Sequence, residues 1–269
     1  MYNLLKGKKG IIFGALDEKS IAWITAMKCS EEGAQIVLSN APVAMRMGEI
    51  NKLAEKINAP VIACDVSNGE DVENLIIKTK EHFGGGFDFI LHSIGMSLNV
   101  RKGKHYTEID YAHNLKTFEI SSMSLHRVLA ACMRHDALNE WGSVVALTYI
   151  AAQRVFPDYN EMADAKSLLE SVARSFGYHY GVKKHVRINT VSQSPTRTTA
   201  GSGVKGFDGF ISYAEKMSPL GNASAEDCGN YCVTLFSDLT RMVTMQNLFH
   251  DGGFSNTGVT SGVIEQMEK

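Results

Sequence analysis

Three side chains near the middle of the chain have the types and the spacing to act together as a general acid. They are Tyr149, Tyr159 and Lys166. Tyr149 follows an apolar run at residues 144–147 that is typical of a buried strand. Pro157 ends any helix before the next segment, and a new helical pattern begins near Tyr159. Lys166 follows seven residues later. Because this is close to two helical turns, both side chains leave one face of the helix, roughly 10 Å apart along its axis.

An ammonium group that faces two phenols favours their ionised form. The three residues therefore predict a tyrosine pKa below its usual value of about 10. Such a phenol can donate a proton, or a strong hydrogen bond, to an oxygen that gains negative charge during a reaction. The same residues also fit a surface lysine beside two packed tyrosines, and their spacing alone leaves both interpretations open.

The composition is that of a globular protein with a sizeable core: 269 residues, 44% hydrophobic and 21% charged. A formal net charge of −2 argues against nucleic acid or an anionic membrane as the main partner. We find no apolar run near 18 residues and no secretory signal pattern, so we expect a cytoplasmic protein. The five cysteines lie mostly within apolar patterns and lack metal-ligand spacing. They predict reduced core residues and no metal site.

Short apolar runs alternate with amphipathic segments, which predicts parallel strands joined by helical crossovers. The expected strands are 10–13, 35–39, 61–64, 87–92, 143–148, 186–191 and 245–250. The expected helices include 20–32, 71–83, 109–134, 159–180 and 225–237. We find no flexible linker and no repeat. We therefore predict one α/β domain over residues 1–269: a Rossmann fold with a doubly wound, mostly parallel seven-stranded sheet and helices on both faces.

The turn after the first strand could hold a dinucleotide. Ser20 has the position of a helix N-cap, so free N–H groups of that helix would face a pyrophosphate. However, Gly14 is the one glycine where the dinucleotide fingerprint has three, and an ordinary βα turn fits equally well. Asn40 ends the second strand, which has no acidic residue there for an adenosine 2′-hydroxyl.

Other strand ends carry polar residues or glycine. Asp65 could accept a hydrogen bond from an adenine amino group or cap the following helix. Gly95 allows a flat ligand to approach the backbone closely. The small and hydroxylic residues of 194–203 suit a phosphate or a carboxamide, but equally a solvated loop. We expect His92 to be a packed strand residue and 251–254 to be a structural turn.

Together these residues resemble the short-chain dehydrogenase/reductase superfamily and, within it, the enoyl-acyl carrier protein reductases of bacterial fatty-acid synthesis. The resemblance covers nearly the whole chain. Its most specific element is Tyr159-x6-Lys166 with Tyr149 ten residues upstream of Tyr159. Carbonyl-reducing members instead have Tyr-x3-Lys with a serine about thirteen residues before the tyrosine. Met162 and Tyr149 stand at those two positions, so the resemblance favours enoyl reduction.

The resemblance implies NADH-dependent reduction of trans-2-enoyl thioesters on acyl carrier protein, the last reductive step of fatty-acid elongation. It implies catalytic roles for Tyr149, Tyr159 and Lys166, with Tyr159 donating to the thioester oxygen and Lys166 holding the nicotinamide ribose. Substrate contacts are implied at Ser97, through its backbone, and at Tyr149, Tyr159 and Met162. Cofactor contacts are implied at Gly14, Ser20, Ile21, Asn40, Asp65, Val66, Ser93, Ile94, Gly95, Lys166, Pro195, Thr196, Thr198 and Ala200.

The resemblance also implies a homotetramer and a substrate loop at about 194–219. The glycines at 201, 203, 206 and 209 raise the entropy cost of a fixed conformation, so we predict that 196–217 is mobile without ligands and orders over a bound acyl chain. The chain departs from the family pattern at three places. Ile24 stands where the first turn usually has its last glycine, which implies looser or shifted packing, and Ser194 replaces a glycine. Asp208 follows Lys205 in a helix that is usually basic, so the carrier protein would dock on other lysines.

Two other functions fit the same fold: a carbonyl reductase, and a dinucleotide-sensing regulator without chemistry. The regulator's expected mark, a broken Tyr/Lys pair, is absent from the sequence. NADH is the expected cofactor because Asn40 offers hydrogen-bonding groups but no cation, although Arg46 would suit NADPH.

Overall fold

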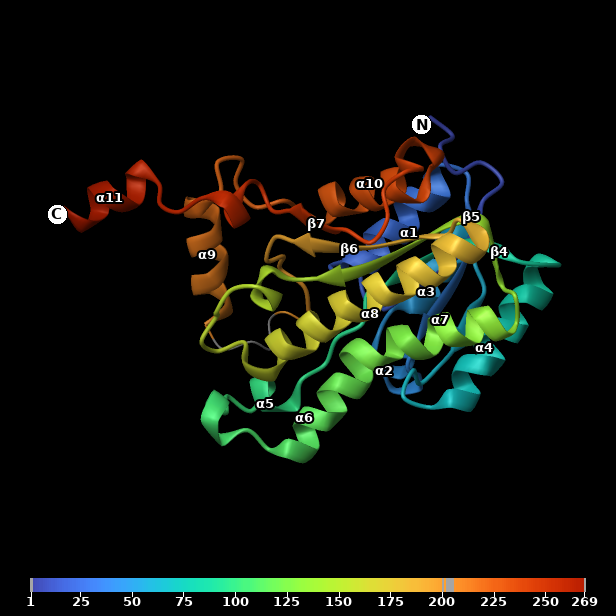
Figure 1. Ribbon diagram of the computed structural model, residues 1–269, viewed down its shortest axis with the longest axis horizontal. Helices are drawn as coiled ribbons and strands as arrows, with labels where there is room; N and C mark the ends of the chain where they lie inside the picture. Colours follow the sequence, from blue (N-terminus) through green and yellow to red (C-terminus); the bar gives the residue numbers. More distant parts are fainter. Residues whose placement is uncertain (1, 200, 202–205, 269) are drawn as a thin grey trace.

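Seven strands form one sheet in which every neighbouring pair is parallel, in the order β3-β2-β1-β4-β5-β6-β7. The computed structural model describes residues 2–199, 201 and 206–268. The strands are β1 (Lys9–Phe13), β2 (Gln35–Asn40), β3 (Val61–Ala63), β4 (Phe87–His92), β5 (Leu138–Thr148), β6 (Arg187–Gln193) and β7 (Asn247–His250) (Figure 1). The strand order reverses between β1 and β4, which is where doubly wound sheets bind ligands. The predicted sheet is confirmed.

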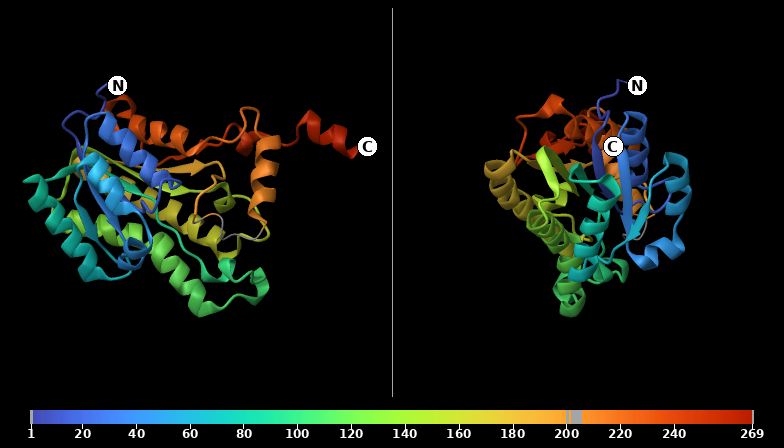
Figure 2. Two further views of the ribbon diagram at one scale, coloured as in Figure 1. Left: turned by 180° about the vertical axis from the view of Figure 1, so that it is seen from behind. Right: turned by 90° about the vertical axis from the view of Figure 1, so that its right-hand side faces the viewer.

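The apolar runs are nearly continuous because both faces of the sheet are covered. Successive side chains of β1 enter opposite cores: Ile11 and Phe13 pack in one, and Ile12 in the other. The first core lies under α4 (Gly69–Phe83), α7 (Ser124–Arg134) and α8 (Asn160–Lys184). The second lies under α1 (Ile21–Glu31), α3 (Ile50–Ile57) and α10 (Ala225–Phe236). Figure 2 shows these two layers from behind and from the side.

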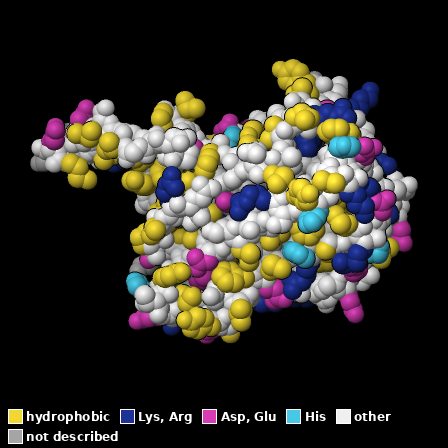
Figure 3. Space-filling view, in the orientation of Figure 1, with side chains coloured by type: hydrophobic (Ala, Val, Ile, Leu, Met, Phe, Trp, Pro, Cys, Tyr) yellow, Lys and Arg dark blue, Asp and Glu magenta, His cyan; other side chains and the backbone are white. Residues whose placement is uncertain are grey.

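The remaining helices lie around the carboxyl ends of the strands and beyond. They are α2 (Pro42–Met47), α5 (Leu98–Arg101), α6 (Tyr111–Phe118), α9 (Phe207–Met217) and α11 (Ser261–Met267), which projects from the body beside α9 (Figure 1). Short 3-10 turns lie at Tyr106–Glu108, Ile150–Ala152, Asp238–Thr240 and Phe254–Asn256. None of the helices within the described ranges has the length and apolarity to cross a membrane. On the face shown in Figure 3, hydrophobic side chains lie among charged ones over α6, α7 and α8.

Two boundaries differ from the sequence prediction for identifiable reasons. β5 begins at Leu138, five residues early, because its register against β4 shifts and Trp141 has a φ of +60°, which breaks the alternation that marks a strand. The helix expected at 109–134 is two α-helices joined by a π-helical turn, Glu119–Met123. Within that turn the Ser121 hydroxyl accepts from the Met96 N–H and donates to the Met96 carbonyl, holding the loop after β4. Such turns are frequent at functional sites.

Ile24, which departs from the pattern of the family that the sequence resembles, lies where α1 packs against α10. A Cβ atom on Gly229 of α10 would stand 3.3 Å from the Ile24 Cγ2 and 3.5 Å from the Thr25 Cα. The absence of a side chain at Gly229 therefore makes room for the isoleucine. This pairing shows how the two helices accommodate the substitution.

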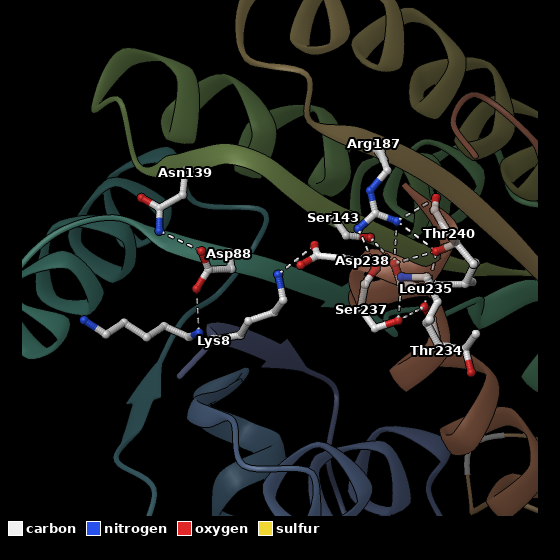
Figure 4. Close-up of polar contacts among 12 residues, drawn as sticks. Lys8, Asp88, Asn139, Ser143, Arg187, Thr234, Leu235, Ser237, Asp238 and Thr240 are labelled. Carbon is white, nitrogen blue, oxygen red and sulfur yellow. Dashed lines mark hydrogen bonds and ion pairs between the residues drawn. The ribbon is translucent and has the colours of Figure 1, made fainter. Parts of the chain in front are cut away.

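Arg187, at the start of β6, is a buried cation far from the strand ends that carry the site residues. Its guanidinium donates to the carbonyls of Leu235 and Ser237 at the end of α10, at 2.8 and 3.1 Å, and to the carbonyl and hydroxyl of Thr240. Figure 4 shows these oxygens gathered around the guanidinium. Because a helix end leaves carbonyls unsatisfied, Arg187 ties α10 to the sheet.

Replacing Arg187 by lysine is expected to lower the free energy of unfolding by about 1–2 kcal/mol, because an ammonium keeps the charge but cannot reproduce the fork of donors. Urea unfolding followed by circular dichroism measures the change. Lys216→Arg, which makes the opposite exchange on the surface helix α9, is the control. An unchanged urea midpoint for Arg187→Lys would show that the fork contributes nothing beyond its charge.

Candidate active site

A cavity of about 1020 Å³ opens at the carboxyl ends of the strands. It is lined by residues at or just after the ends of β1, β2, β3, β4, β5 and β6, together with N-terminal turns of α1 and α8. The predicted site residues that line it are Gly14, Ser20, Ile21, Asn40, Val66, Ser93, Ile94, Gly95, Ser97, Tyr149, Tyr159, Met162, Lys166, Pro195, Thr196 and Thr198. Segments far apart in the sequence are therefore brought to one site. Ala200 lies outside the described residues.

The turn after β1 brings backbone and helix terminus to the cavity. Gly14 has a φ of +92°, and a Cβ there would stand 2.0 Å from the Ser93 carbonyl oxygen, so no other residue fits. The Ser20 hydroxyl caps α1 by accepting from the Trp23 N–H, which leaves other N–H groups of the first turn facing the cavity. Asn40 donates from Nδ2 to the Ala15 carbonyl, so the end of β2 holds this turn in place.

Asp65, an implied cofactor contact, lies just after β3. It does not belong to the cavity lining, although its neighbours Cys64 and Val66 do. Its Oδ1 instead accepts from the Ser67 N–H at 2.9 Å and from the Ser67 hydroxyl at 2.7 Å. The carboxylate is therefore used within its own turn. Asn68, and not Asp65, is the N-cap of α4, so the capping alternative is wrong, and the implied cofactor contact of Asp65 stays a prediction.

Lys166 is 8% exposed, and its Nζ donates to the Leu147 carbonyl at 2.8 Å. Burial lowers the pKa of this lysine from 10.5 to about 8, and the nearby Glu170 opposes the shift. A side chain on Gly95 would bring a Cβ within 3.9 Å of Nζ, so the glycine keeps open the space in front of the ammonium. At neutral pH the Lys166 ammonium is therefore a positive charge in the wall of the cavity.

The two tyrosines lie together, with ring centroids 5.2 Å apart in an edge-to-face arrangement. The expected fall in their pKa is wrong: burial raises the pKa of both phenols above 10. The cost of removing a phenolate from water exceeds the benefit of the lysine's field. Both groups are therefore neutral at physiological pH, and a neutral phenol is the form that can donate a hydrogen bond.

Tyr159 also differs in its placement. It precedes α8 by one residue, because Asn160 has a φ of +45°, a conformation that asparagine tolerates better than most residues. The spacing predicted that the helix would set the direction of the Tyr159 side chain. Because Tyr159 lies outside α8, the helix does not set it. Its ring packs instead against Val100, Met162 and Ala165.

Glu170 was not singled out by its sequence pattern, although it lies one helical turn after Lys166. Its Oε1 accepts from the Thr148 hydroxyl at 2.9 Å and its Oε2 from the Gln153 amide at 3.3 Å. These partners flank Tyr149 on both sides in the sequence. Glu170 therefore anchors the turn that carries Tyr149 to α8.

A second glutamate that the sequence reading missed lies deeper. Glu161 is fully buried, and its Oε1 accepts from the Ser97 hydroxyl at 2.5 Å and from the Thr117 hydroxyl at 3.2 Å. The Ser97 hydroxyl also accepts from the Val100 N–H as the cap of α5. The Ser97 side chain is therefore engaged inside the protein, which leaves its backbone for the implied substrate contact; that contact stays a prediction.

The end of the cavity near β2 bears on the choice of cofactor. Asn40, Ala41, Val43 and Glu49 line it, whereas the exposed Arg46 of α2 does not. Among the described lining residues the cations are Arg101 and Lys166, neither of which comes from residues 40–49. Glu49 forms an ion pair with Lys52, which is not among the residues that line this end. A ligand in the cavity therefore meets the carboxylate and, among the described lining residues, no cation here, which suits a ribose hydroxyl better than a phosphate.

Known proteins match this sequence and this structure over nearly their whole length. A family model described as "Enoyl-(Acyl carrier protein) reductase" matches residues 14–255. Enoyl-[acyl-carrier-protein] reductase [NADH] 2 of Rhizobium meliloti is 32% identical, over 96% of this chain and 96% of the relative. The crystal structure of the FabI–NADH complex from Alistipes finegoldii is similar with a TM-score of 0.95 and 64% identity, covering 96% of this chain and 92% of that one. The chain therefore belongs to the enoyl-acyl carrier protein reductase family.

Proposed function

We infer that this protein reduces trans-2-enoyl thioesters to saturated acyl thioesters with NADH, in fatty-acid synthesis. The observation that carries this inference is one cavity lined by Tyr149, Tyr159 and Lys166, with Met162 where a carbonyl reductase would have its tyrosine. The family match and the NADH complex of the Alistipes finegoldii protein support it.

The residues around the cavity fit a dinucleotide. The side-chain-free Gly14, the N-terminus of α1 and Asn40 would hold its adenosine and pyrophosphate end, and Lys166 its nicotinamide ribose. When bound, the nicotinamide supplies a hydride to the β-carbon of the enoyl thioester. Lys166 keeps the surrounding potential positive while binding the ribose hydroxyls.

Tyr159 stabilises the negative charge that this reduction creates on the substrate. As the β-carbon accepts a hydride, negative charge collects on the thioester oxygen as an enolate. The α-carbon then takes a proton from water, delivered with the help of Tyr149, which gives the saturated thioester. The neutral Tyr159 phenol donates a hydrogen bond to that oxygen, and the bond strengthens as the charge grows. Tyr149, held by the Glu170 anchor and packed against the Tyr159 ring, shapes the pocket, and Met162 lines the acyl site.

The partner and setting of the reaction are part of the proposal. We propose that the substrate arrives on acyl carrier protein and that the chain is one domain with a substrate loop at about 194–219. A homotetramer would cover the exposed apolar side chains of α6 and α8, which are Tyr111, Leu115, Tyr178 and Val182. A cytoplasmic location suits the five free, buried cysteines.

The first experiment follows the absorbance of NADH with the purified protein and a trans-2-enoyl thioester, then with a ketone. We expect NADH to be consumed with the enoyl thioester alone. Consumption with the ketone instead would identify a carbonyl reductase. Binding of NADH without turnover of either compound would identify a dinucleotide-sensing regulator.

NADH is expected to be a modestly better substrate than NADPH, because Glu49 and not Arg46 lines the cavity near Asn40. The comparison is kcat/KM for the two cofactors with one enoyl thioester. Glu49→Gln, which removes the negative charge, should narrow the difference. A kcat/KM tenfold higher with NADPH, about 1.4 kcal/mol in transition-state binding, would contradict this assignment.

A further inference from the structure

Two consecutive side chains at the carboxyl end of β6 bind the segment that leads into α10. Gln193 and Ser194 are each 4% exposed. The Gln193 amide nitrogen donates to the Ala223 carbonyl at 3.0 Å, and the Ser194 hydroxyl accepts from the Ala223 N–H at 3.0 Å. Both backbone groups of Ala223 are therefore held by side chains from the end of β6. Because Ser194 begins the proposed substrate loop and Ala223 lies just after it, these bonds join the two ends of that loop.

The oxygen of the Gln193 amide has a partner on the neighbouring strand. Gln193 and His250 are register partners in β6 and β7, and the Gln193 Oε1 lies 2.6 Å from the His250 Nδ1. The amide nitrogen faces the Ala223 carbonyl, so the amide oxygen accepts from the histidine, and this pattern assigns the hydrogen to Nδ1. The His250 ring is stacked on the Tyr231 ring of α10, with centroids 4.9 Å apart. Helix α10 therefore fixes the direction from which the histidine donates.

Gln193, Ser194 and His250 form one hydrogen-bonded unit, which we call the loop clamp. The Ser194 N–H donates to the His250 carbonyl at 3.1 Å, which extends the pairing with β7 past the last residue of β6. The Thr196 hydroxyl donates to the Ser194 carbonyl at 2.9 Å. Pro195 and Thr196 are both residues that line the site cavity. The clamp therefore holds the substrate loop at the point where its first residues reach the site.

Ser194 stands where the family pattern has glycine, and the clamp gives its side chain a role. A glycine at this position has no oxygen to accept from the Ala223 N–H. Buried side-chain networks that are hydrogen-bonded in this way rigidify the backbone segments that they join. The departure from the family pattern therefore adds a fixed point at the base of the loop.

We propose that the loop clamp positions the turn at Ser194 and Pro195, where the substrate loop leaves β6, so that NADH meets this turn in one arrangement. This rests on the proposed function, which supplies NADH as the ligand. A segment that is already ordered loses less conformational entropy on binding, so its contacts contribute more to affinity. Gln193 and His250 are positioning residues, because they act through the backbone of the turn. The part of the loop that moves then begins at Thr196.

Substitutions at Gln193 and His250 test the clamp and leave the catalytic side chains unchanged. Gln193→Met keeps an unbranched side chain of similar length but removes its hydrogen bonds. His250→Phe keeps a ring to stack on Tyr231 and removes the donor, whereas His250→Asn keeps an N–H near the Nδ1 position and removes the ring. Gln246→Met, at an exposed glutamine whose amide donates to the Thr244 carbonyl, is the matched control.

The measurement is the Kd for NADH from fluorescence titration of the purified protein, with urea unfolding as the check on the fold. We expect Gln193→Met and His250→Phe to raise the Kd about tenfold. His250→Asn should stay within about threefold of the parent, because it keeps the donor. The double variant with Gln193→Met and His250→Phe should bind about as weakly as Gln193→Met alone, because both changes remove the same hydrogen bond. Gln246→Met should keep the parental Kd.

Steady-state kinetics with trans-2-dodecenoyl coenzyme A provide a second readout. The KM for NADH should rise in Gln193→Met and His250→Phe, while kcat at saturating NADH stays near the parental value. This split is expected because the clamp sets how NADH is bound and does not touch the reacting atoms. A fall in kcat without a change in the KM for NADH would contradict the assignment.

Three results of the titration would overturn the proposal. An unchanged Kd in both Gln193→Met and His250→Phe, even with reduced stability, would make the clamp merely structural. A loss of affinity in Gln193→Met but not in His250→Phe would mean that Gln193 contacts the cofactor directly. Equal losses in His250→Phe and His250→Asn would assign the effect to the ring and not to the hydrogen bond. If Gln193→Met does not fold, the two His250 variants decide.

The proposed function is judged separately from the clamp. If the parent protein binds NADH but reduces no enoyl thioester, the proposed function fails, and the Kd values of the variants still decide the role of the clamp. If the parent binds no NADH, both the proposed function and the clamp are wrong.

Discussion

Replacing Tyr159 by phenylalanine is expected to lower kcat about tenfold to a hundredfold, the largest kinetic loss among single tyrosine substitutions in the site. Hydrogen-bond donors to a fully localised oxyanion contribute roughly 2.7–4 kcal/mol to transition-state stabilisation. The enolate of a thioester is delocalised, so its donor should contribute less. Burial keeps the phenol neutral, and hence able to donate, throughout the physiological pH range.

Tyr149→Phe provides the comparison for this prediction. It should cost less kcat than Tyr159→Phe and act mainly on KM, because Tyr149 shapes the pocket next to the reacting group. Steady-state kinetics of both single variants and of the double variant decide the roles. A greater loss of kcat in Tyr149→Phe would reverse the assignment of the two tyrosines.

Replacing Lys166 by alanine is expected to weaken NADH binding roughly tenfold to a hundredfold, the effect of losing one hydrogen bond to a charged group. The fold should be affected less, because the core side of α8 is built by other residues, including Leu169 and Val172. Fluorescence titration of NADH and urea unfolding measure the two effects separately. Parental affinity for NADH in the Lys166→Ala variant would exclude the ribose-binding role.

The lowered pKa of Lys166 adds a dependence on pH. The side chain is charged below about pH 8 and loses its proton above it, so the Kd for NADH of the parent should rise between pH 7 and pH 9.5. Stability should change in the opposite direction. Between about pH 8 and 10.5 the unfolded lysine binds more protons than the folded one, so this group's contribution to the free energy of unfolding increases with pH. In Lys166→Ala both contributions should be absent.

The alternation of strand and helix could be read from the sequence because periodicity is a local property. The strand expected at 87–92 was found with those bounds, and most others differ by one or two residues. The Tyr159-x6-Lys166 spacing and Met162 are equally local, and through the family resemblance they favour enoyl over carbonyl reduction. Gly14 and Ser20 predicted a βα turn with a capped helix, because their conformational preferences belong to single residues, but they left open whether that turn holds a cofactor.

What the sequence by itself determined is therefore the order of the elements, the parallel sheet and the residues that reach its carboxyl edge. The tertiary structure alone decided the charge state of those residues, because desolvation depends on neighbours from distant segments. Burial makes Tyr159 a neutral donor where the nearby lysine predicted the reverse. The anchor from Glu170 to Thr148 joins residues 22 positions apart, and the site cavity gathers residues from the ends of several strands. Such features depend on packing across the fold, which no local pattern encodes.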